Sequence, residues 1–285
     1  MTDFRDIPPN RAFWRRFCRN RLAITGVLVL IVLYVVALVA PLLASQPYDA
    51  INSGDRFLGP SAQYWLGTDH LGRDIWSRIV WGSRISLTVG FLSAGVAICV
   101  GTCLGALSGY FGGWVDSLIS RFIEVVVSMP QFFLLLAVAA VLPRSIWSIM
   151  LIIGLTSWPS IARIVRGEVL SLRERDFTQA ARALGATDQR IIWRQILPNA
   201  AAPIIVSTTL RIGHAILAES GLSFLALGTP PPYPSWGSIV AGGKDYLREA
   251  PWISLAPGLF IFMAVLSFNF VGDGLRDALD PKLKR

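Results

Sequence analysis

Long runs of apolar residues are the feature that most restricts what this chain can fold into. They cover residues 22–44, 85–110, 122–142, 146–161, 200–228 and 253–271. The first run contains no charged side chain, and a helix of that length crosses a hydrocarbon core of about 30 Å. We therefore expect an all-α integral membrane protein with about six transmembrane helices, the first of them an uncleaved span rather than a signal peptide.

The charged residues agree with a membrane protein and argue against a nucleic-acid-binding one. Only 15% of the residues are charged, compared with about 25% in ordinary soluble domains. The net charge of +8 comes from Lys and Arg that lie between the apolar runs, with no basic recognition face. We expect a lipid bilayer, and no nucleic acid, as the partner of this surface.

The distribution of basic residues predicts the topology. Segments on one side of the predicted membrane carry eighteen Lys and Arg, and the opposite loops carry seven. Because basic residues are enriched in cytoplasmic segments, both termini are predicted to be cytoplasmic. The longest cytoplasmic loop then covers residues of about 163–198.

Local details of the spans are also predictable. Glycines in residues 85–110 would permit close helix contacts, Pro130 is expected to kink the third span, and Trp158-Pro159 is expected to end the fourth. Cys99 and Cys103 are interpreted as small packing residues rather than as a reactive pair.

The long cytoplasmic loop is predicted to form two short helices. One apolar face repeats with helical spacing at Phe177, Ala180, Ala181 and Leu184. Asp176 can cap the first helix and Gly185 can end it, while Thr187 can cap a second helix that Pro198 ends. The hairpin could lie on lipid headgroups with its arginines extended to them, or it could dock on another protein.

The same loop resembles a known motif. Gln179-Ala180-Ala181-Arg182-x-x-Gly185, followed by Ile196-Leu197-Pro198, is similar to the EAA loop of binding-protein-dependent ABC importer permeases. In that family the loop provides the coupling helix that sits in a groove of the ATPase subunit. Gln179 stands where the family usually has Glu, so a role of that carboxylate does not carry over, although an amide still forms hydrogen bonds.

Other motifs make the resemblance more specific. The external signature loop, which contains Gly67, Thr68, Asp69, Gly72, Arg73, Asp74 and Arg78, resembles the dipeptide, oligopeptide and nickel subfamily. Residues 222–228, the proline-rich residues 230–237 and the tail at 272–281 resemble it as well. The first span, the signature loop and the Asp-Pro tail are similar to the C-type permease of that subfamily.

The resemblance implies a permease subunit in a bacterial inner membrane, with the transmembrane fold of type I ABC importers. Residues 1–84 would form the cytoplasmic tail, first helix and external loop, and residues 85–285 the permease core. Implied partners are a homologous B-type permease, two cytoplasmic ABC ATPases and an extracytoplasmic solute-binding protein. ATP and Mg would be bound by the ATPases, with no cofactor on this chain. Peptides are the expected solute, with nickel or another small solute as the alternative.

The external signature loop has a simpler structural interpretation beside a role in gating or receptor docking. Gly67 and Gly72 would permit tight turns, and Asp74 would cap a short helix and pair with Arg78. The spacing of the carboxylates does not match a calcium loop. The prolines at 230–234, with Tyr233 and Trp236, are expected to form a stiff loop beside an interfacial aromatic belt.

Three polar residues interrupt the fifth apolar run: Arg211, His214 and Glu219. Charges at this depth normally face a protein interior or an aqueous cavity. They could form a lock between helices or line the solute pathway, and we expect the lock for Arg211 and the pathway for Glu219. His214 has no neighbouring ligand with metal-site spacing.

The chain carries no motif for nucleotide phosphates, zinc proteases or serine hydrolases, so no catalytic residue is assigned. A secondary transporter would show paired broken helices in matching halves, and no such symmetry is found. A structural anchor would need neither the charged fifth span nor the cytoplasmic hairpin. A secondary transporter and a structural membrane subunit remain the alternatives to the non-catalytic permease that the resemblance implies.

Overall fold

The computed structural model describes residues 9–279, which are helical apart from loops and one isolated bridge between Thr68 and Asp74. The helices are α1 (Pro9–Arg19), α2 (Arg21–Leu38), α3 (Ala40–Leu43), α4 (Ile75–Phe111), α5 (Gly113–Ser128), α6 (Gln131–Val141), α7 (Ile146–Arg173), α8 (Asp176–Ala183), α9 (Asp188–Ile191), α10 (Leu197–Asn199), α11 (Ala201–Phe224), α12 (Trp236–Gly243) and α13 (Trp252–Leu279). One-turn 3-10 helices cover Ser53–Asp55 and Lys244–Tyr246.

Five of these helices are long and apolar enough to cross a membrane: α2, α4, α7, α11 and α13. Helices α5 and α6 pass the same test together, with a bend of 85° between them. The prediction of about six spans is therefore confirmed if this bent pair counts as one span.

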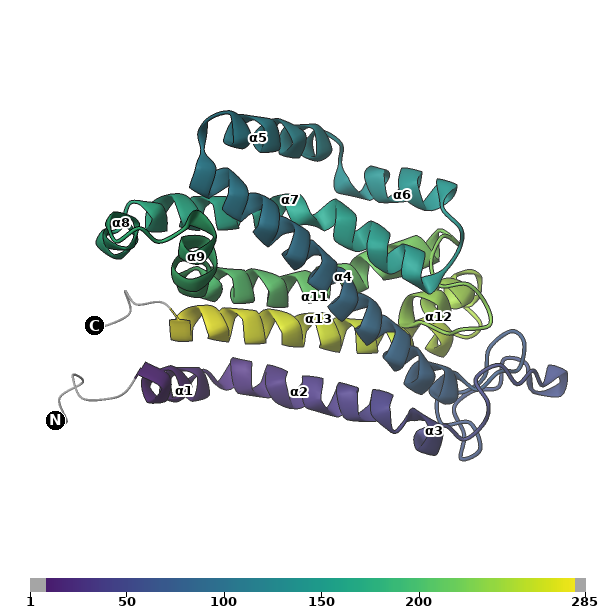
Figure 1. Cartoon of the computed structure of the whole chain (residues 1–285). Helices are drawn as coiled ribbons and strands as arrows, with labels where there is room; N and C mark the ends of the chain where they lie inside the picture. The colour runs from purple at the N-terminus through teal and green to yellow at the C-terminus, as the bar shows by residue number, and fades with distance from the viewer. Residues whose placement is uncertain (1–8, 280–285) are drawn as a thin grey trace.

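Helix α4 crosses α7 at the centre of the bundle, where glycines bring the two backbones together (Figure 1). A Cβ atom added at Gly101, Gly105 or Gly109 would lie 2.5–2.9 Å from atoms of α7. Van der Waals packing at such short distances holds helices together in lipid, where the hydrophobic effect does not drive their association. The predicted role of the glycine-rich segment is confirmed.

Helix α7 does not end at Pro159, as the sequence had suggested, but continues to Arg173. A proline inside a helix removes one hydrogen bond and costs about 3 kcal/mol in water. Here α7 is packed against α4 on both sides of the proline, from Gly154 to Val169. This packing holds the helix together, so residues 163–173 belong to α7 rather than to a loop.

Pro130 produces a break rather than the predicted kink. Met129 and Pro130 have extended backbone conformations between α5 and α6. Proline cannot donate the backbone hydrogen bond that would continue the helix, and it disfavours a helical residue before it. Gln131 Nε2 then donates to Ser157 Oγ at 3.0 Å, which ties the first turn of α6 to α7.

The first span lies along α13 on the outside of the bundle (Figure 1). A Cβ at Gly26 of α2 would lie 2.8 Å from the carbonyl oxygen of Ser267, and a Cβ at Gly274 of α13 would lie 2.3 Å from Cβ of Ala23. The span is interrupted at Val39 and ends with α3, shortly before the predicted boundary at residue 44.

The two ends of the bundle differ in content. Helices α8 and α9 lie at the same end as α1 and the end of α13, and α3, α12 and the loop before α4 lie at the other end (Figure 1). Among the described residues, α1 and the last turns of α13 thus share an end with the loop between α8 and α9, opposite the loops that precede α4 and α12 (Figure 1). The termini themselves, for which the cytoplasmic side was predicted, lie outside the described residues.

Candidate functional site

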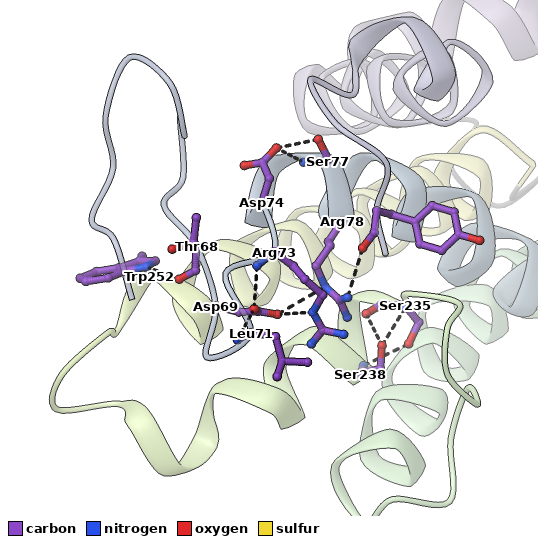
Figure 2. A network of polar contacts seen from close by, with 11 residues as sticks. Thr68, Asp69, Leu71, Arg73, Asp74, Ser77, Arg78, Ser235, Ser238 and Trp252 are labelled. Carbon is purple, nitrogen blue, oxygen red and sulfur yellow. Dashed lines mark hydrogen bonds and ion pairs between the residues drawn. The ribbon is translucent and has the colours of Figure 1, made fainter. Parts of the chain in front are cut away.

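The external signature loop is built around the buried carboxylate of Asp69. Its Oδ1 accepts hydrogen bonds from the backbone N–H groups of Leu71 and Arg73, at 2.8 and 3.0 Å. Its Oδ2 lies 2.7 Å from Nε of Arg73 and 4.0 Å from Nε of Arg78, as Figure 2 shows. Arg78 is 6% exposed, and its other contact is a donation to the carbonyl oxygen of Tyr48.

The two glycines of this loop are required by its turns, as predicted. Gly67 and Gly72 have φ values of +76° and +75°. A Cβ at Gly72 would overlap the carbonyl oxygen of Asn52 at 1.7 Å, and one at Gly67 would lie 2.6 Å from the carbonyl oxygen of Leu58. The loop therefore has both a backbone conformation and a packing that exclude a side chain at these positions.

Asp74 caps a helix, but its partners differ from those predicted. It caps α4, which has 37 residues rather than being short, and its Oδ2 accepts from Ser77 N and Ser77 Oγ at 3.0 and 2.6 Å. Ser45 Oγ also donates to it, at 2.8 Å. Arg78 pairs with Asp69 instead of Asp74, whose Oδ1 has no hydrogen-bond partner among the described residues.

His70 lies beside the same arginines at the external end. Its ring stacks on Tyr246, with centroids 5.5 Å apart. Burial lowers the pKa of His70, and the nearby Arg73 and Arg78 lower it further against the opposing effect of Asp69. Burial therefore favours the neutral imidazole, whose ring packs against Tyr246.

Glu219 is fully buried and gathers three hydroxyl groups. Its Oε1 accepts from Ser223 at 2.7 Å, Thr229 at 3.0 Å and Ser235 at 2.7 Å, which come from α11, the following loop and the cap of α12. Its Oε2 has no hydrogen-bond partner among the described residues. This carboxylate ties the external loop to the end of α11.

Trp236 strengthens the same connection from the first position of α12, and not from the stiff loop in which it was predicted. It is 0% exposed, its backbone N–H donates to Ser86 Oγ, and its Nε1 donates to the carbonyl oxygen of Ile79. Tyr233 of the same loop is 51% exposed. Trp236 is therefore a core residue that fixes α12 on α4.

Arg211 lies near the middle of α11 and points towards α7, where its guanidinium donates to Ser160 Oγ. It borders a cavity of about 260 Å³ at the break between α5 and α6. Within residues 9–279 it forms no ion pair with a carboxylate. His214, one turn further along, is exposed on the surface of α11.

Arg211 and Glu219 thus have separate environments. The carboxylate is enclosed by hydroxyls at the external end, and the guanidinium borders a cavity beside the middle of α11. These positions favour the reverse of the expected assignment, with a lock at Glu219 and a pathway role at Arg211. The roles themselves remain proposals.

The cytoplasmic hairpin contains the two predicted short helices. Gly185 has φ = +78°, and Thr187 caps α9 by accepting from Arg190 N. Asp176 does not cap α8, because Arg175 occupies the cap position without a side-chain bond. Pro198 does not end the second helix, since a π turn (Ile192–Ile196) leads into α10 and onward to α11.

The outer face of α8 is exposed. Gln179 and Ala180 are exposed, and Leu184 is 87% exposed. Ala181 and Thr178 face inwards, where Thr178 Oγ1 donates to the carbonyl oxygen of Leu172 at 2.8 Å. Phe177 of α8 is partly exposed as well, at 39%, so two large apolar side chains of the hairpin are left uncovered.

Tyr110, at the cytoplasmic end of α4, connects to this hairpin and was not predicted. Its hydroxyl donates to Asp188 Oδ1 at 2.5 Å, and Arg182 lies over its ring at 5.6 Å. Arg173 donates to its carbonyl oxygen at 2.9 Å. These contacts join residues 63 to 78 positions apart, which no local pattern in one sequence indicates.

A second connection at this end was also missed. Arg166 of α7 donates to both carboxylate oxygens of Asp116 on α5, at 2.6 and 2.7 Å, and Ser108 donates to the same group. A bidentate pair of this kind fixes orientation as well as distance. It holds the start of α5 to α7, on the cytoplasmic side of the break at Pro130.

No group of three His, Cys, Asp or Glu side chains within the described part of the chain could hold a metal ion. The polar groups found there either cap helices, connect elements or border the cavity at Arg211. These groups position helices or can contact a solute. The contacts described above include no nucleophile that is hydrogen-bonded to a general base.

The chain matches known membrane proteins along its length. Residues 101–285 match the family described as the binding-protein-dependent transport system inner membrane component. Residues 9–60 match the N-terminal TM domain of oligopeptide transport permease C.

Two curated relatives cover nearly all of the chain. The dipeptide transport system permease protein DppC of Alkalihalophilus pseudofirmus is 44% identical over 278 residues, covering 98% of this chain and 91% of the relative. The glutathione transport system permease protein GsiD of Pectobacterium atrosepticum is 43% identical over 279 residues, covering 97% and 92%.

Solved structures support the fold. The inward-facing MetNI methionine ABC transporter aligns with a TM-score of 0.59 at 19% identity, covering 71% of this chain and 97% of that one. An amino acid ABC transporter aligns with a TM-score of 0.54 at 15% identity, covering 70% and 92%. At this identity the likeness shows a shared transmembrane fold alone.

Proposed function

The chain belongs to the family of binding-protein-dependent transport system inner membrane components, and from this premise we propose that it imports peptides as one of two permease subunits. The observation that carries the substrate class is the identity of 43–44% with dipeptide and glutathione permeases over nearly the whole chain. Dipeptides and glutathione share a peptide bond and a free carboxylate, which defines the class of solute.

The partners follow from the architecture of such importers. A homologous B-type permease would complete the pathway, two cytoplasmic ATPases would bind ATP and Mg, and an extracytoplasmic binding protein would deliver the peptide. The exposed face of α8 supports contact with an ATPase, because Leu184 and Ala180 are uncovered at the tip of the hairpin. Small residues there permit close approach to a groove.

Coupling would proceed through α8 and the ends of α4 and α7. Closure of the ATPases on ATP would draw the two hairpins together. The contacts of Tyr110 with Asp188, Arg173 and Arg182 would transmit this movement to α4, and α7 would follow because it runs directly into the hairpin. The rigid external end would then tilt as a unit and open the pathway to one side at a time.

The test is peptide uptake by the complete complex in proteoliposomes. We expect ATP-dependent accumulation of a labelled dipeptide when the chain is reconstituted with its partner permease, both ATPases and the loaded binding protein. A complex that assembles and hydrolyses ATP but accumulates no peptide, while it accumulates nickel, would contradict the peptide assignment and support the alternative solute.

The topology can be tested in cells. In a background without Cys18, Cys99 and Cys103, a cysteine at residue 185 is expected to resist an impermeant thiol reagent, and one at residue 233 to react. Tyr233 is half-exposed in the loop that precedes α12, and Gly185 lies in the loop between α8 and α9. Because α12 and α8 lie at opposite ends of the bundle (Figure 1), the two positions report on the two sides. Labelling of residue 185 from outside would reverse the orientation.

A further inference from the structure

The cavity at the break between α5 and α6 has a composition that suits an anion. Two of its lining residues are cationic, Arg163 and Arg211, and four carry hydroxyl or amide groups, namely Gln131, Thr156, Ser157 and Ser160. None is acidic, and the other lining residues are apolar.

Arg211 is the group best placed to bind a ligand in this cavity. Its guanidinium carries five N–H donors, and one of its nitrogens donates a hydrogen bond to Ser160 Oγ. No carboxylate within residues 9–279 neutralises it through an ion pair. It lies ten residues into α11, about 15 Å along the helix, where an uncompensated charge needs an aqueous or protein environment.

The helix break contributes independently to the same place. Backbone that is not helical is tolerated at membrane depth only where protein buries it or where it lines an aqueous cavity. The break at Met129 and Pro130 borders this cavity, and so does the first turn of α6 at Gln131 and Leu134. The N-terminal end of a helix carries a partial positive charge, which adds to that of Arg211.

We propose that this cavity is a subsite of the transport pathway that binds the terminal carboxylate of the peptide through Arg211. The proposal rests on the proposed function, and it adds a recognition step within the permease itself. A planar guanidinium matches a carboxylate with two parallel hydrogen bonds, whereas a peptide ammonium would be repelled. Gln131 and Ser157, already bonded to each other at 3.0 Å, border the same space and can contact the adjoining amide.

The size of the cavity limits what it holds. Its volume of about 260 Å³ is below the roughly 300–1,000 Å³ of pockets that enclose whole drug-sized ligands. It is large enough for the carboxyl end of a peptide and too small to enclose a long one. This arrangement suits a transporter of peptides with different side chains, because every such substrate shares the terminal carboxylate.

Thiol protection tests the subsite without relying on transport. The purified complex of both permeases and both ATPases would carry Thr156→Cys in a background lacking the three native cysteines. Thr156 borders the cavity, and its hydroxyl bonds only to carbonyls of its own helix, so the substitution disturbs no contact between helices. The rate of maleimide labelling is then measured with dialanine and with its C-terminal amide.

We expect dialanine to slow labelling at concentrations where the amide does not, and Arg211→Met to abolish this protection. Equal protection by both compounds, no protection by either, or no labelling of the cysteine would each overturn the proposal. Because this measurement needs no uptake, its failure is distinct from failure of peptide transport by the parent complex.

Uptake kinetics provide the second measurement. Arg211→Met and the cavity-filling Thr156→Phe are each expected to lower the maximum uptake rate about tenfold, equivalent to about 1.4 kcal/mol, with half-saturation unchanged because the binding protein sets it. Arg121→Gln, at an exposed arginine of α5, is the matched control with parental uptake. If Arg211→Met prevents assembly, Thr156→Phe decides, and parental rates in Thr156→Phe would refute the subsite.

Discussion

The external end and the cytoplasmic hairpin of this protein are both made of short helices and loops, yet they are held in different ways. At the external end, the buried carboxylates of Asp69, Asp74 and Glu219 each accept several hydrogen bonds. Those of Asp69 come from its own loop, and those of Asp74 and Glu219 come from different segments. At the hairpin, the outer face of α8 is exposed and the fixed contacts lie only on its inner side.

The difference indicates how the two ends can serve transport. A region whose buried carboxylates each accept several hydrogen bonds resists deformation, because unpairing these buried groups is costly. At the projecting hairpin, a partner protein can instead cover apolar side chains that are exposed to solvent in this chain alone. We therefore expect substitutions at the external end to affect stability first, and substitutions at the hairpin to affect coupling first.

The largest effect on stability is expected at Gly72. In Gly72→Ala the new Cβ would overlap the carbonyl oxygen of Asn52, and the residue would keep a positive φ. Backbone strain costs about 1–3 kcal/mol, and overpacking adds about 1–3 kcal/mol. The purified complex should melt at a much lower temperature or fail to assemble.

The matched control for this change is Gly59→Ala in the same external segment. No atom lies within 4 Å of a Cβ at Gly59, and its φ is not positive. This variant should melt like the parent, and similar melting of both alanine variants would show that the external loop is not rigid.

The next largest effect is expected at Glu219. Glu219→Leu leaves three hydroxyls without their acceptor, at about 1–3 kcal/mol for each group that stays buried and unsatisfied. Glu219→Gln keeps the Oε1 acceptor and changes only the oxygen that lacks a partner, so it should melt close to the parent.

Thermal melting of the two variants, measured together with uptake, separates a lock from a pathway role. Parental stability with altered uptake in Glu219→Leu would restore the pathway role for this residue. A large loss of stability in Glu219→Gln would show that the second oxygen has a partner of its own.

A smaller loss of stability, with a large loss of function, is expected at Gly185. Its φ of +78° makes Gly185→Arg strained by about 1–3 kcal/mol, but a Cβ there meets open space. The long side chain should hold α8 away from the ATPase, so uptake falls while the protein still inserts and melts nearly normally.

Gly185→Asn is the control, because asparagine tolerates the left-handed conformation better than most residues. It should retain uptake. Normal uptake by Gly185→Arg, with the ATPases bound, would refute the coupling role of this loop.

The smallest effect is expected from Gln179→Glu, which restores the residue usual in the related loop. The side chain is exposed, with Glu174 Oε2 at 3.5 Å from its Nε2. A second carboxylate would be repelled weakly in water, within about 1 kcal/mol. Melting should be unchanged and the ATPase rate of the complex should change less than about twofold, and a larger change would give position 179 a direct part in coupling.

The membrane spans and the glycine turns of this protein could be predicted from the sequence alone. Apolar length predicted the spans, and the positive φ values of Gly67, Gly72 and Gly185 were predicted from turn chemistry. Each of these follows from local chemistry or from the solvent, so neighbouring residues suffice to indicate it.

The tertiary structure decided the partners. It joined Arg78 to Asp69, Glu219 to Ser235 and Tyr110 to Asp188, and it kept α7 helical through Pro159 while α5 and α6 separated at Pro130. Two prolines in similar apolar runs had opposite outcomes because α7 is packed against the glycines of α4 and the α5–α6 segment is not. A sequence specifies which residues can bend, cap or carry charge, but packing between distant segments determines which of them do so.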